Sequence, residues 1–98
     1  MSDFVLTPAA QGDLLKILEY LEGENPDAIL KVVDALDEAM QLLADHPGIG
    51  HIRPDLTAQD VRFWTVFRYL VIYRPDTNPL EIVRVLHGSR DLRRLLRD

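Results

Sequence analysis

Cysteine is absent from this chain of 98 residues. A disulfide framework and a thiolate metal site are therefore both excluded. Long hydrophobic runs are absent too, since the longest strictly apolar stretch, Tyr69 to Tyr73, is far shorter than the roughly 20 residues that cross a bilayer. The first residues, MSDFVLTPAAQGD, lack the basic flank and the apolar core of a secretory signal. These absences predict a cytoplasmic protein that makes no membrane contact.

Lysine is scarce, and none occurs after residue 60. Residues 1–60 hold 3 Lys and Arg against 12 Asp and Glu, a net charge of -9, whereas residues 61–98 hold 8 Arg against 4 acids, a net charge of +4. The two values sum to the formal net charge of -5. This asymmetry predicts a cationic face on an acidic body. Ordinary solvated surface charge is the alternative explanation.

The first half of the chain has the pattern of a short strand followed by two helices. Residues 4–6 are apolar, and Thr7 followed by Pro8 is a helix cap with a suitable first helical residue. We expect this helix to stop at Gly23 and a second helix to begin at Pro26. So short a connection predicts an antiparallel helical hairpin. The predicted inward stripes are Ala10, Leu14, Ile17, Leu18 and Leu21 in the first helix and Ile29, Val32, Val33, Leu36, Met40 and Leu43 in the second.

The second half has the pattern of an antiparallel meander. Residues 47–60 contain prolines and glycines and are predicted to form a loop. Strands are predicted over 61–65, 68–74 and 80–86. Ser89 is a candidate cap for a final helix that docks through Leu92, Leu95 and Leu96. The predicted fold class is therefore α+β: an N-terminal strand, a two-helix hairpin, a three-stranded antiparallel meander and a short C-terminal helix, all in one domain over residues 1–98.

A histidine and several arginines gather where the last predicted strand ends. Arg84, His87 and Arg90 are close together in the sequence, and we expect function at this basic patch. Each residue has a structural alternative. The His87 imidazole could bond a backbone carbonyl and fix the turn that follows. Arg84 lies within an apolar strand and would either reach the surface or form a buried ion pair with a carboxylate such as Asp91.

Aromatic residues surround the first predicted hairpin of the sheet, at Phe63, Trp64, Phe67 and Tyr69. Proteins that bind single-stranded nucleic acid use such rings for base stacking. Cross-strand packing explains these rings without a ligand and is the prediction adopted. His46 and His51 lie in the loop without a carboxylate at a metal-ligand spacing, so neither a metal site nor a cofactor is predicted.

Two leucines stand off the inward stripes of the predicted helices. Leu15 and Leu30 are therefore expected to be exposed on the outside of the hairpin. Isolated exposed leucines are ordinary in proteins. If these two lie near one another, with acidic residues as a rim, they would offer a groove to an amphipathic helix of a partner.

Four stretches carry a resemblance to a known family: residues 7–21 (TPAAQGDLLKILEYL), 46–50 (HPGIG), 68–75 (RYLVIYRP) and 81–91 (EIVRVLHGSRD). Together they resemble the RelE/ParE toxin superfamily over nearly the whole chain, and the last stretch resembles the ParE branch. The resemblance departs at Phe67, where glycine is usual, and in the arginine-rich tail after Asp91. It implies the toxin of a type II toxin-antitoxin system of the plasmid-stabilization kind, which inhibits DNA gyrase.

The same resemblance implies a partner, a ParD-like ribbon-helix-helix antitoxin whose disordered tail folds on the toxin to give a hetero-oligomer. The expected mechanism is contact without catalysis and without sequence-specific binding of nucleic acid by the toxin alone. The residues expected to bind the target are Arg84, His87, Arg90, Arg93 and Arg94. The residues expected to bind the antitoxin are Leu15, Leu30, Tyr69 and Tyr73.

The competing hypothesis is a ribosome-dependent mRNA endonuclease of the RelE type. That chemistry needs a general base, a general acid and cations around the phosphate. The candidates are Glu81, His87, Arg68, Arg74 and Arg84. Against them, strand alternation places Glu81 and Arg84 on opposite faces, and an acidic helical half suits RNA poorly. A third hypothesis is a degenerate relative that is kept only as a binding module.

Overall fold

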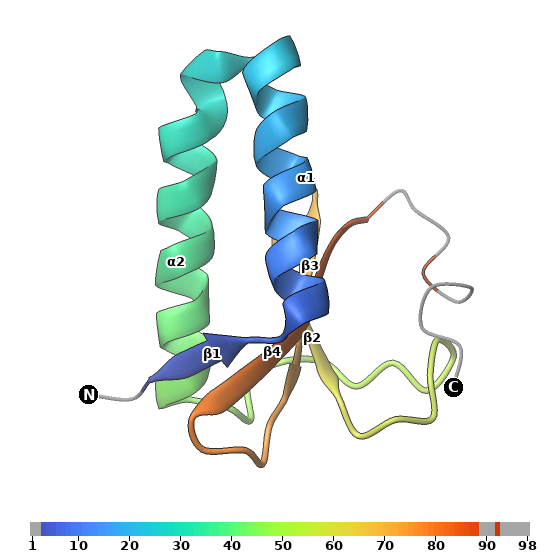
Figure 1. The fold of residues 1–98 in the computed structure, drawn as a ribbon. Coiled ribbons are helices and arrows are strands. Elements are labelled where there is room, and N and C mark those ends of the chain that lie inside the picture. Colours follow the sequence, from blue (N-terminus) through green and yellow to red (C-terminus); the bar gives the residue numbers. More distant parts are fainter. Residues whose placement is uncertain (1–2, 89–91, 93–98) are drawn as a thin grey trace.

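The computed structural model describes residues 3–88 and Leu92. The elements are β1 (Phe4–Leu6), α1 (Pro8–Glu24), the 3-10 turn η1 (Pro26–Ala28), α2 (Ile29–Asp45), β2 (Arg62–Val66), β3 (Tyr69–Arg74) and β4 (Leu80–His87). An N-terminal strand, two helices and an antiparallel meander confirm these parts of the α+β prediction (Figure 1). The final helix predicted after Ser89 lies outside the described residues, apart from Leu92.

The four strands form one sheet in the order β1-β4-β3-β2. β2, β3 and β4 pair antiparallel, whereas β1 pairs parallel with β4, so that Phe4 lies opposite Leu80 and Leu6 opposite Ile82. The sequence predicted the N-terminal strand but not its place in the sheet. Because β1 leads directly into α1, this pairing fixes the start of the helical hairpin against the last strand.

Thr7 joins β1 to α1 in the way that its cap signature predicts. Its hydroxyl oxygen accepts a hydrogen bond from the Ala10 N–H at 3.1 Å and donates one to the Val83 carbonyl at 2.7 Å. At its other end the helix continues through Gly23 to Glu24, beyond the predicted stop. A glycine inside a helix costs only about 1 kcal/mol, which tertiary packing outweighs. Asn25 then ends the helix and donates its N–H to the Leu21 carbonyl at 2.8 Å.

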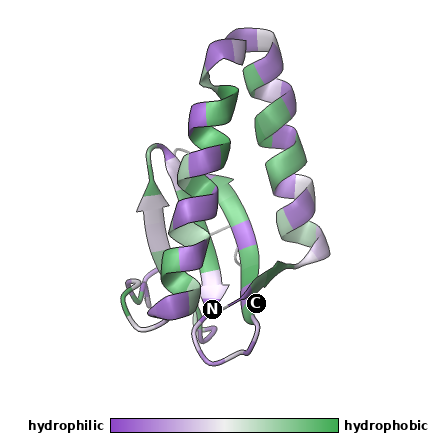
Figure 2. Ribbon diagram, turned by 90° about the vertical axis from the view of Figure 1, so that its left-hand side faces the viewer, coloured by the Kyte–Doolittle hydropathy of each residue, from purple (hydrophilic) through white to green (hydrophobic). Residues whose placement is uncertain are grey.

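The sheet carries an apolar cluster on each of its faces. One face packs against both helices in a cluster that includes Leu36, Leu43 and Val71. The other face carries a smaller cluster of Val61, Phe63, Ile72 and Leu86, against which Leu56, Val83 and Leu92 are partly buried. Figure 2 shows hydrophobic bands alternating with hydrophilic ones along both helices. Val33 was predicted to point inward but is 38% exposed.

Phe67 and Arg68 make the tight turn between β2 and β3. Phe67 has a φ of 54°, in the left-handed region that favours glycine. The departure from glycine noted in the sequence thus falls at the position where the backbone requires this conformation. Lys31 lies over the Phe67 ring, with its Nζ 5.5 Å from the ring centroid, so the turn is tied to the start of α2.

Candidate functional site

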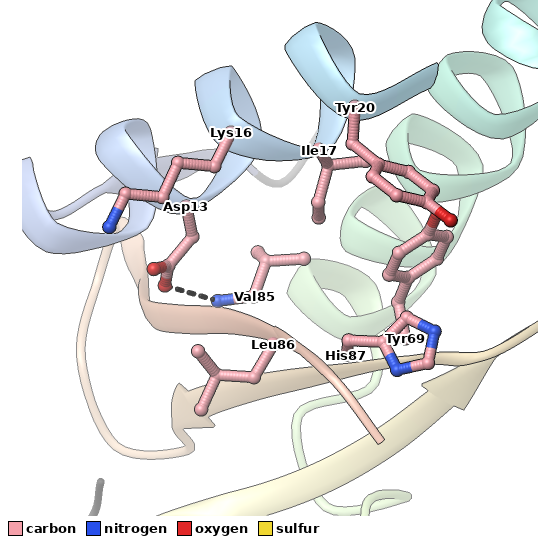
Figure 3. Close-up of a pocket in the computed structure, with 8 residues that line it drawn as sticks. All are labelled: Asp13, Lys16, Ile17, Tyr20, Tyr69, Val85, Leu86 and His87. Carbon is pink, nitrogen blue, oxygen red and sulfur yellow. Dashed lines mark hydrogen bonds between the residues drawn. The ribbon is translucent and has the colours of Figure 1, made fainter. Parts of the chain in front are cut away.

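A cleft of about 370 Å³ opens between α1 and the ends of β3 and β4. Its lining residues are Asp13, Lys16, Ile17 and Tyr20 from α1, Tyr69 from β3, and Val85, Leu86 and His87 from β4 (Figure 3). The apolar members form the floor, while an ammonium, a phenol and an imidazole supply polar groups. The cleft therefore coincides with the end of the last strand, where the sequence predicted the functional patch.

Asp13, which lines the cleft, forms an ion pair with the partly buried Arg84. The Asp13 carboxylate accepts hydrogen bonds from Arg84 Nε at 2.7 Å and Arg84 Nη2 at 2.8 Å, and a third from the Val85 N–H at 3.0 Å (Figure 3 draws this last bond). Asp13 is only 7% exposed. The hydrogen bond to Asp13 raises the pKa of the Arg84 guanidinium, more than burial lowers it. This bidentate geometry clamps α1 onto β4.

The clamp decides the position of Asp13 and between the two alternatives for Arg84. Asp13 was not included in the predicted inward stripe of its helix, but it is buried against β4. Arg84 is an ion-pair member, and its partner is Asp13 rather than Asp91, which lies outside the described residues. Because both oxygens of the carboxylate hold the guanidinium, Arg84 is not available as a free cation for a target.

A β-bulge accompanies the clamp. Tyr73 pairs with Ile82 and Ile72 pairs with Arg84, so β4 carries one extra residue, Val83. Bulges interrupt the alternation of side chains and redirect them. The prediction from strict alternation, that Glu81 and Arg84 lie on opposite faces, is therefore not a valid guide in this strand.

His87 ends β4 at the rim of the cleft. Its ring stands edge-on to the Tyr69 ring, with the centroids 5.7 Å apart and the planes at 90°. It also lines a neighbouring hollow of about 380 Å³, which Phe67, Arg68 and Gly88 help to form. The Gly88 N–H donates to the Arg68 carbonyl at 2.7 Å, which joins the end of β4 to the β2–β3 turn. The other residues expected to bind the target, Arg90, Arg93 and Arg94, lie outside the described residues.

An apolar groove lies elsewhere on the helical hairpin. It measures about 190 Å³ and is lined from β1, α1 and α2 by residues that include Leu14, Leu18 and Val33, with Asp37 as an acidic member. Leu15 and Leu30 are exposed, at 58% and 75%, which confirms their predicted exposure. Neither lines the groove. Each stands three residues from a lining residue, Leu18 or Val33, and so extends the apolar surface outward from its helix.

The two tyrosines expected to bind an antitoxin lie elsewhere. Tyr69 is 7% exposed and borders the cleft rather than the groove. Tyr73 is fully buried, and its hydroxyl donates to the Pro47 carbonyl at 2.7 Å and accepts from the Gly50 N–H at 2.9 Å. A Cβ at Gly50 would collide with the Tyr73 ring, so only glycine fits. Tyr73 therefore anchors the loop after α2 and is removed from the candidate contact surface.

Comparison with known proteins decides the family. The family profile described as ParE toxin of type II toxin-antitoxin system, parDE, matches residues 4–92. The chain belongs to the ParE toxin family. A solved structure titled as a chromosomal ParDE TA system from P. aeruginosa contains a chain with the same fold, at a TM-score of 0.71 and 24% identity. The alignment covers 91% of this chain and 98% of that one. No curated protein matches the sequence.

The residues that a RelE-type nuclease would need are dispersed in this ParE family member. Arg74 and Glu81 pair with each other, with Nε and Oε1 2.9 Å apart, at the turn between β3 and β4. His87 ends β4 six residues beyond Glu81, a separation of roughly 20 Å along an extended strand. Arg84 is held by Asp13. Arg68 lines the same hollow as His87. Because Glu81, Arg74 and Arg84 are engaged elsewhere, the five candidates do not converge on one phosphate.

Among residues 3–88 and Leu92, no helix is both long and apolar enough to cross a bilayer. Within the same residues, no three His, Asp or Glu side chains gather in a way that could hold a metal ion.

Sequence reasoning missed Asp13, Lys16 and Tyr20. A signal for Asp13 existed, because it lies three residues after Ala10 and four before Ile17, two residues of the inward stripe. Lys16 and Tyr20 follow at similar spacings on the same side of α1. Nothing in the sequence indicated that this side of α1 faces the end of β4.

Proposed function

We propose that this protein is the toxin of a type II toxin-antitoxin system and inhibits DNA gyrase by contact, without catalysing a reaction. The observation that carries the proposal is the match to the ParE toxin family over residues 4–92. The target surface is the end of β4 with the segment that follows it: His87, Arg90, Arg93 and Arg94. Arg84 supports this surface from behind through its ion pair with Asp13.

A ParD-like ribbon-helix-helix antitoxin neutralises the toxin by covering the helical hairpin. The apolar groove beside Leu14, Leu18 and Val33, extended by the exposed Leu15 and Leu30, suits the apolar side of a partner helix. Acidic residues such as Asp34 and Asp37 are exposed along α2 and would form the polar rim. The target surface and the antitoxin surface therefore involve different residues, which makes the proposal testable by mutation.

The first experiment asks which machine is inhibited. Purified protein is added separately to a gyrase supercoiling reaction and to ribosomes that translate a defined message. Inhibited supercoiling with an intact message supports the proposal. Message cut at defined codons, with cleavage lost on changing His87 or Glu81, would instead establish the RelE-type nuclease. Inactivity in both reactions would favour a binding module without toxicity.

The second experiment separates the two surfaces. Replacing Arg90 and Arg93 by alanine should abolish growth inhibition while antitoxin binding stays nearly intact, because neither residue belongs to the proposed antitoxin surface. The matched control is Arg53→Ala with Arg74→Ala, which removes two arginines that pair with Asp55 and Glu81 instead. Growth inhibition should survive in the control. Loss of antitoxin binding in the Arg90/Arg93 variant would place both partners on one surface and contradict the proposal.

A further inference from the structure

The cations that lack an ionic partner gather at one end of the molecule. Among residues 3–88 and Leu92, Arg53, Arg74 and Arg84 are each paired with a carboxylate, and Arg62 bonds the Gly48 and Gly50 carbonyls. The remaining cations in this part of the chain are Lys16, Lys31 and Arg68, all exposed. Lys16 lines the cleft, Arg68 lines the adjoining hollow, and Lys31 lies over the Phe67 ring of that hollow.

Two exposed aromatic rings line the same cleft and hollow as these cations. Tyr20 borders the cleft and is 64% exposed, and Phe67 borders the hollow and is 54% exposed. The cleft and the hollow share Tyr69 and His87 as lining residues, so they adjoin at that pair. The rings and the cations come from α1, α2 and the β2–β3 turn. Only the tertiary structure brings them to one surface, here called the cation–ring surface: Lys16, Tyr20, Lys31, Phe67, Arg68 and His87.

We propose that the cation–ring surface binds single-stranded DNA without sequence preference. Proteins that hold single strands combine cations along the phosphates with rings on which successive bases stack. This surface supplies both. An acidic protein segment would use the cations but would not need two flat rings that are each more than half exposed. Duplex DNA would offer phosphates but no unstacked bases to the rings.

The nearby charges limit the expected strength. The Asp13 carboxylate in the cleft is neutralised by Arg84. Asp27 and Asp34 lie one helical turn from Lys31, so this cation acts in a partly acidic setting. Three phosphate contacts on a single strand predict a slope of about -2 for the logarithm of the affinity against the logarithm of the salt concentration. Binding should therefore be weak and strongly dependent on salt.

The choice of DNA over RNA rests on the proposed function, because gyrase acts on DNA strands. The surface adjoins the end of β4, which is the proposed contact with gyrase. A toxin that holds both the enzyme and an exposed strand would resist displacement more than one that holds the enzyme alone. Strand binding itself is measured without gyrase, so its outcome is independent of whether gyrase is the target.

The test measures fluorescence anisotropy of a fluorescein-labelled dT12 oligonucleotide titrated with the full chain at 50, 100 and 200 mM salt. We expect saturable binding that weakens with a slope of about -2. The double variant Lys16→Gln with Arg68→Gln should bind dT12 about tenfold more weakly. The magnitude of its salt slope should fall to less than about 1. Tyr20→Ala should weaken the affinity for dT12 roughly fivefold or more, because base stacking is lost, and should leave the salt slope unchanged.

The matched control is Arg53→Gln with Arg74→Gln, which changes the net charge equally but lies away from the cation–ring surface. It should bind dT12 within about twofold of the parent chain. Circular dichroism checks that every variant is folded. The proposal is overturned by an absence of saturable dT12 binding at 50 mM salt, by an equal loss in the control, or by tighter binding of rU12. Displacement of dT12 by poly-L-glutamate at equal charge would also overturn it, in favour of an acidic protein partner.

Discussion

Asp13 is the residue that joins the helical half of the protein to the proposed target surface. Its carboxylate accepts all three of its hydrogen bonds from β4, two from the Arg84 side chain and one from the Val85 backbone. The position of the last strand end therefore depends on a residue more than 70 positions earlier in the chain.

Replacing Asp13 by alanine should lower the free energy of unfolding by about 2–3 kcal/mol, because it leaves a partly buried guanidinium and a backbone N–H without acceptors. Arg84 retains some solvent access, so the loss should stay below that of a fully buried pair. Urea denaturation measures it. The control is Asp37→Ala, which removes an exposed carboxylate bonded only to Gln41 and should cost less than about 0.5 kcal/mol. Equal losses would mean that the clamp adds no stability.

Tyr73 acts at the same scale, within the core cluster that the two helices cover. Its hydroxyl bonds the Pro47 carbonyl and the Gly50 N–H, and its ring fills the space that a Cβ at residue 50 would need. Burial raises the pKa of the Tyr73 hydroxyl above its ordinary value of 10.0, more than the Gly50 hydrogen bond lowers it. The folded state therefore keeps this proton at a pH where the unfolded chain releases it.

The contribution of protonated Tyr73 to the free energy of unfolding should therefore be fully present below about pH 10. It should be lost as the pH rises above that value. Tyr73→Phe should remove this part of the alkaline loss. At neutral pH the same variant should unfold about 1–2 kcal/mol more easily, because two backbone groups lose a partner. Urea denaturation at pH 7, 9 and 10.5 compares the two chains. An identical alkaline decline in both would show that Tyr73 is not the responsible group.

At the scale of elements, Thr7 connects three of them. It ends β1, caps α1 through the Ala10 N–H, and bonds the Val83 carbonyl at the bulge of β4. Its backbone N–H adds a bond to the Ile82 carbonyl at 3.0 Å. The residue that the sequence identified as a helix cap is therefore also the link between helix and sheet.

Thr7→Ala should destabilise the protein by about 1–2 kcal/mol, at the upper end for a lost helix cap, because the bond to the Val83 carbonyl is lost as well. Thr7→Ser retains the hydroxyl and should cost less than about 0.5 kcal/mol. Thermal unfolding followed by circular dichroism compares the three chains. If serine proved as damaging as alanine, the methyl group rather than the hydroxyl would be the important part of the side chain.

At the scale of the whole molecule, the sheet separates two apolar clusters of unequal size. The larger has both helices as its cover. The smaller is covered by Leu56 from the loop after α2 and by Leu92. Leu92 lies in the sequence between Arg90 and Arg93, so the segment that carries the proposed target residues also includes a residue that contributes to the fold.

Leu92→Ala should therefore lower the free energy of unfolding by about 1–2 kcal/mol, less than for a fully buried leucine. Leu15→Ala is the control, because Leu15 is 58% exposed and should be nearly neutral for stability. Denaturant titration of both variants measures the difference. A neutral effect of Leu92→Ala would contradict this prediction. The cover of the second face would then have to come from other residues.

The sequence by itself determined the elements of this protein and its family. The cap at Thr7, the apolar period of both helices and the runs of β-branched residues act over short distances, so they predicted the hairpin and the meander closely. Strand ends moved by about one residue and α1 passed through Gly23, because packing outweighs the small preference of one glycine. The motif at residues 81–91 indicated the ParE branch, and the family match agrees.

Only the tertiary structure decided which side chains are available. Arg84 was expected at the target surface, and Tyr73 at the antitoxin surface, yet each is engaged by a partner far away in the chain. Local periodicity carries no information on such partners, and the bulge at Val83 breaks the alternation that would have located them. The meeting of Lys16, Tyr20 and His87 around one cleft likewise exists only once α1 lies on β4.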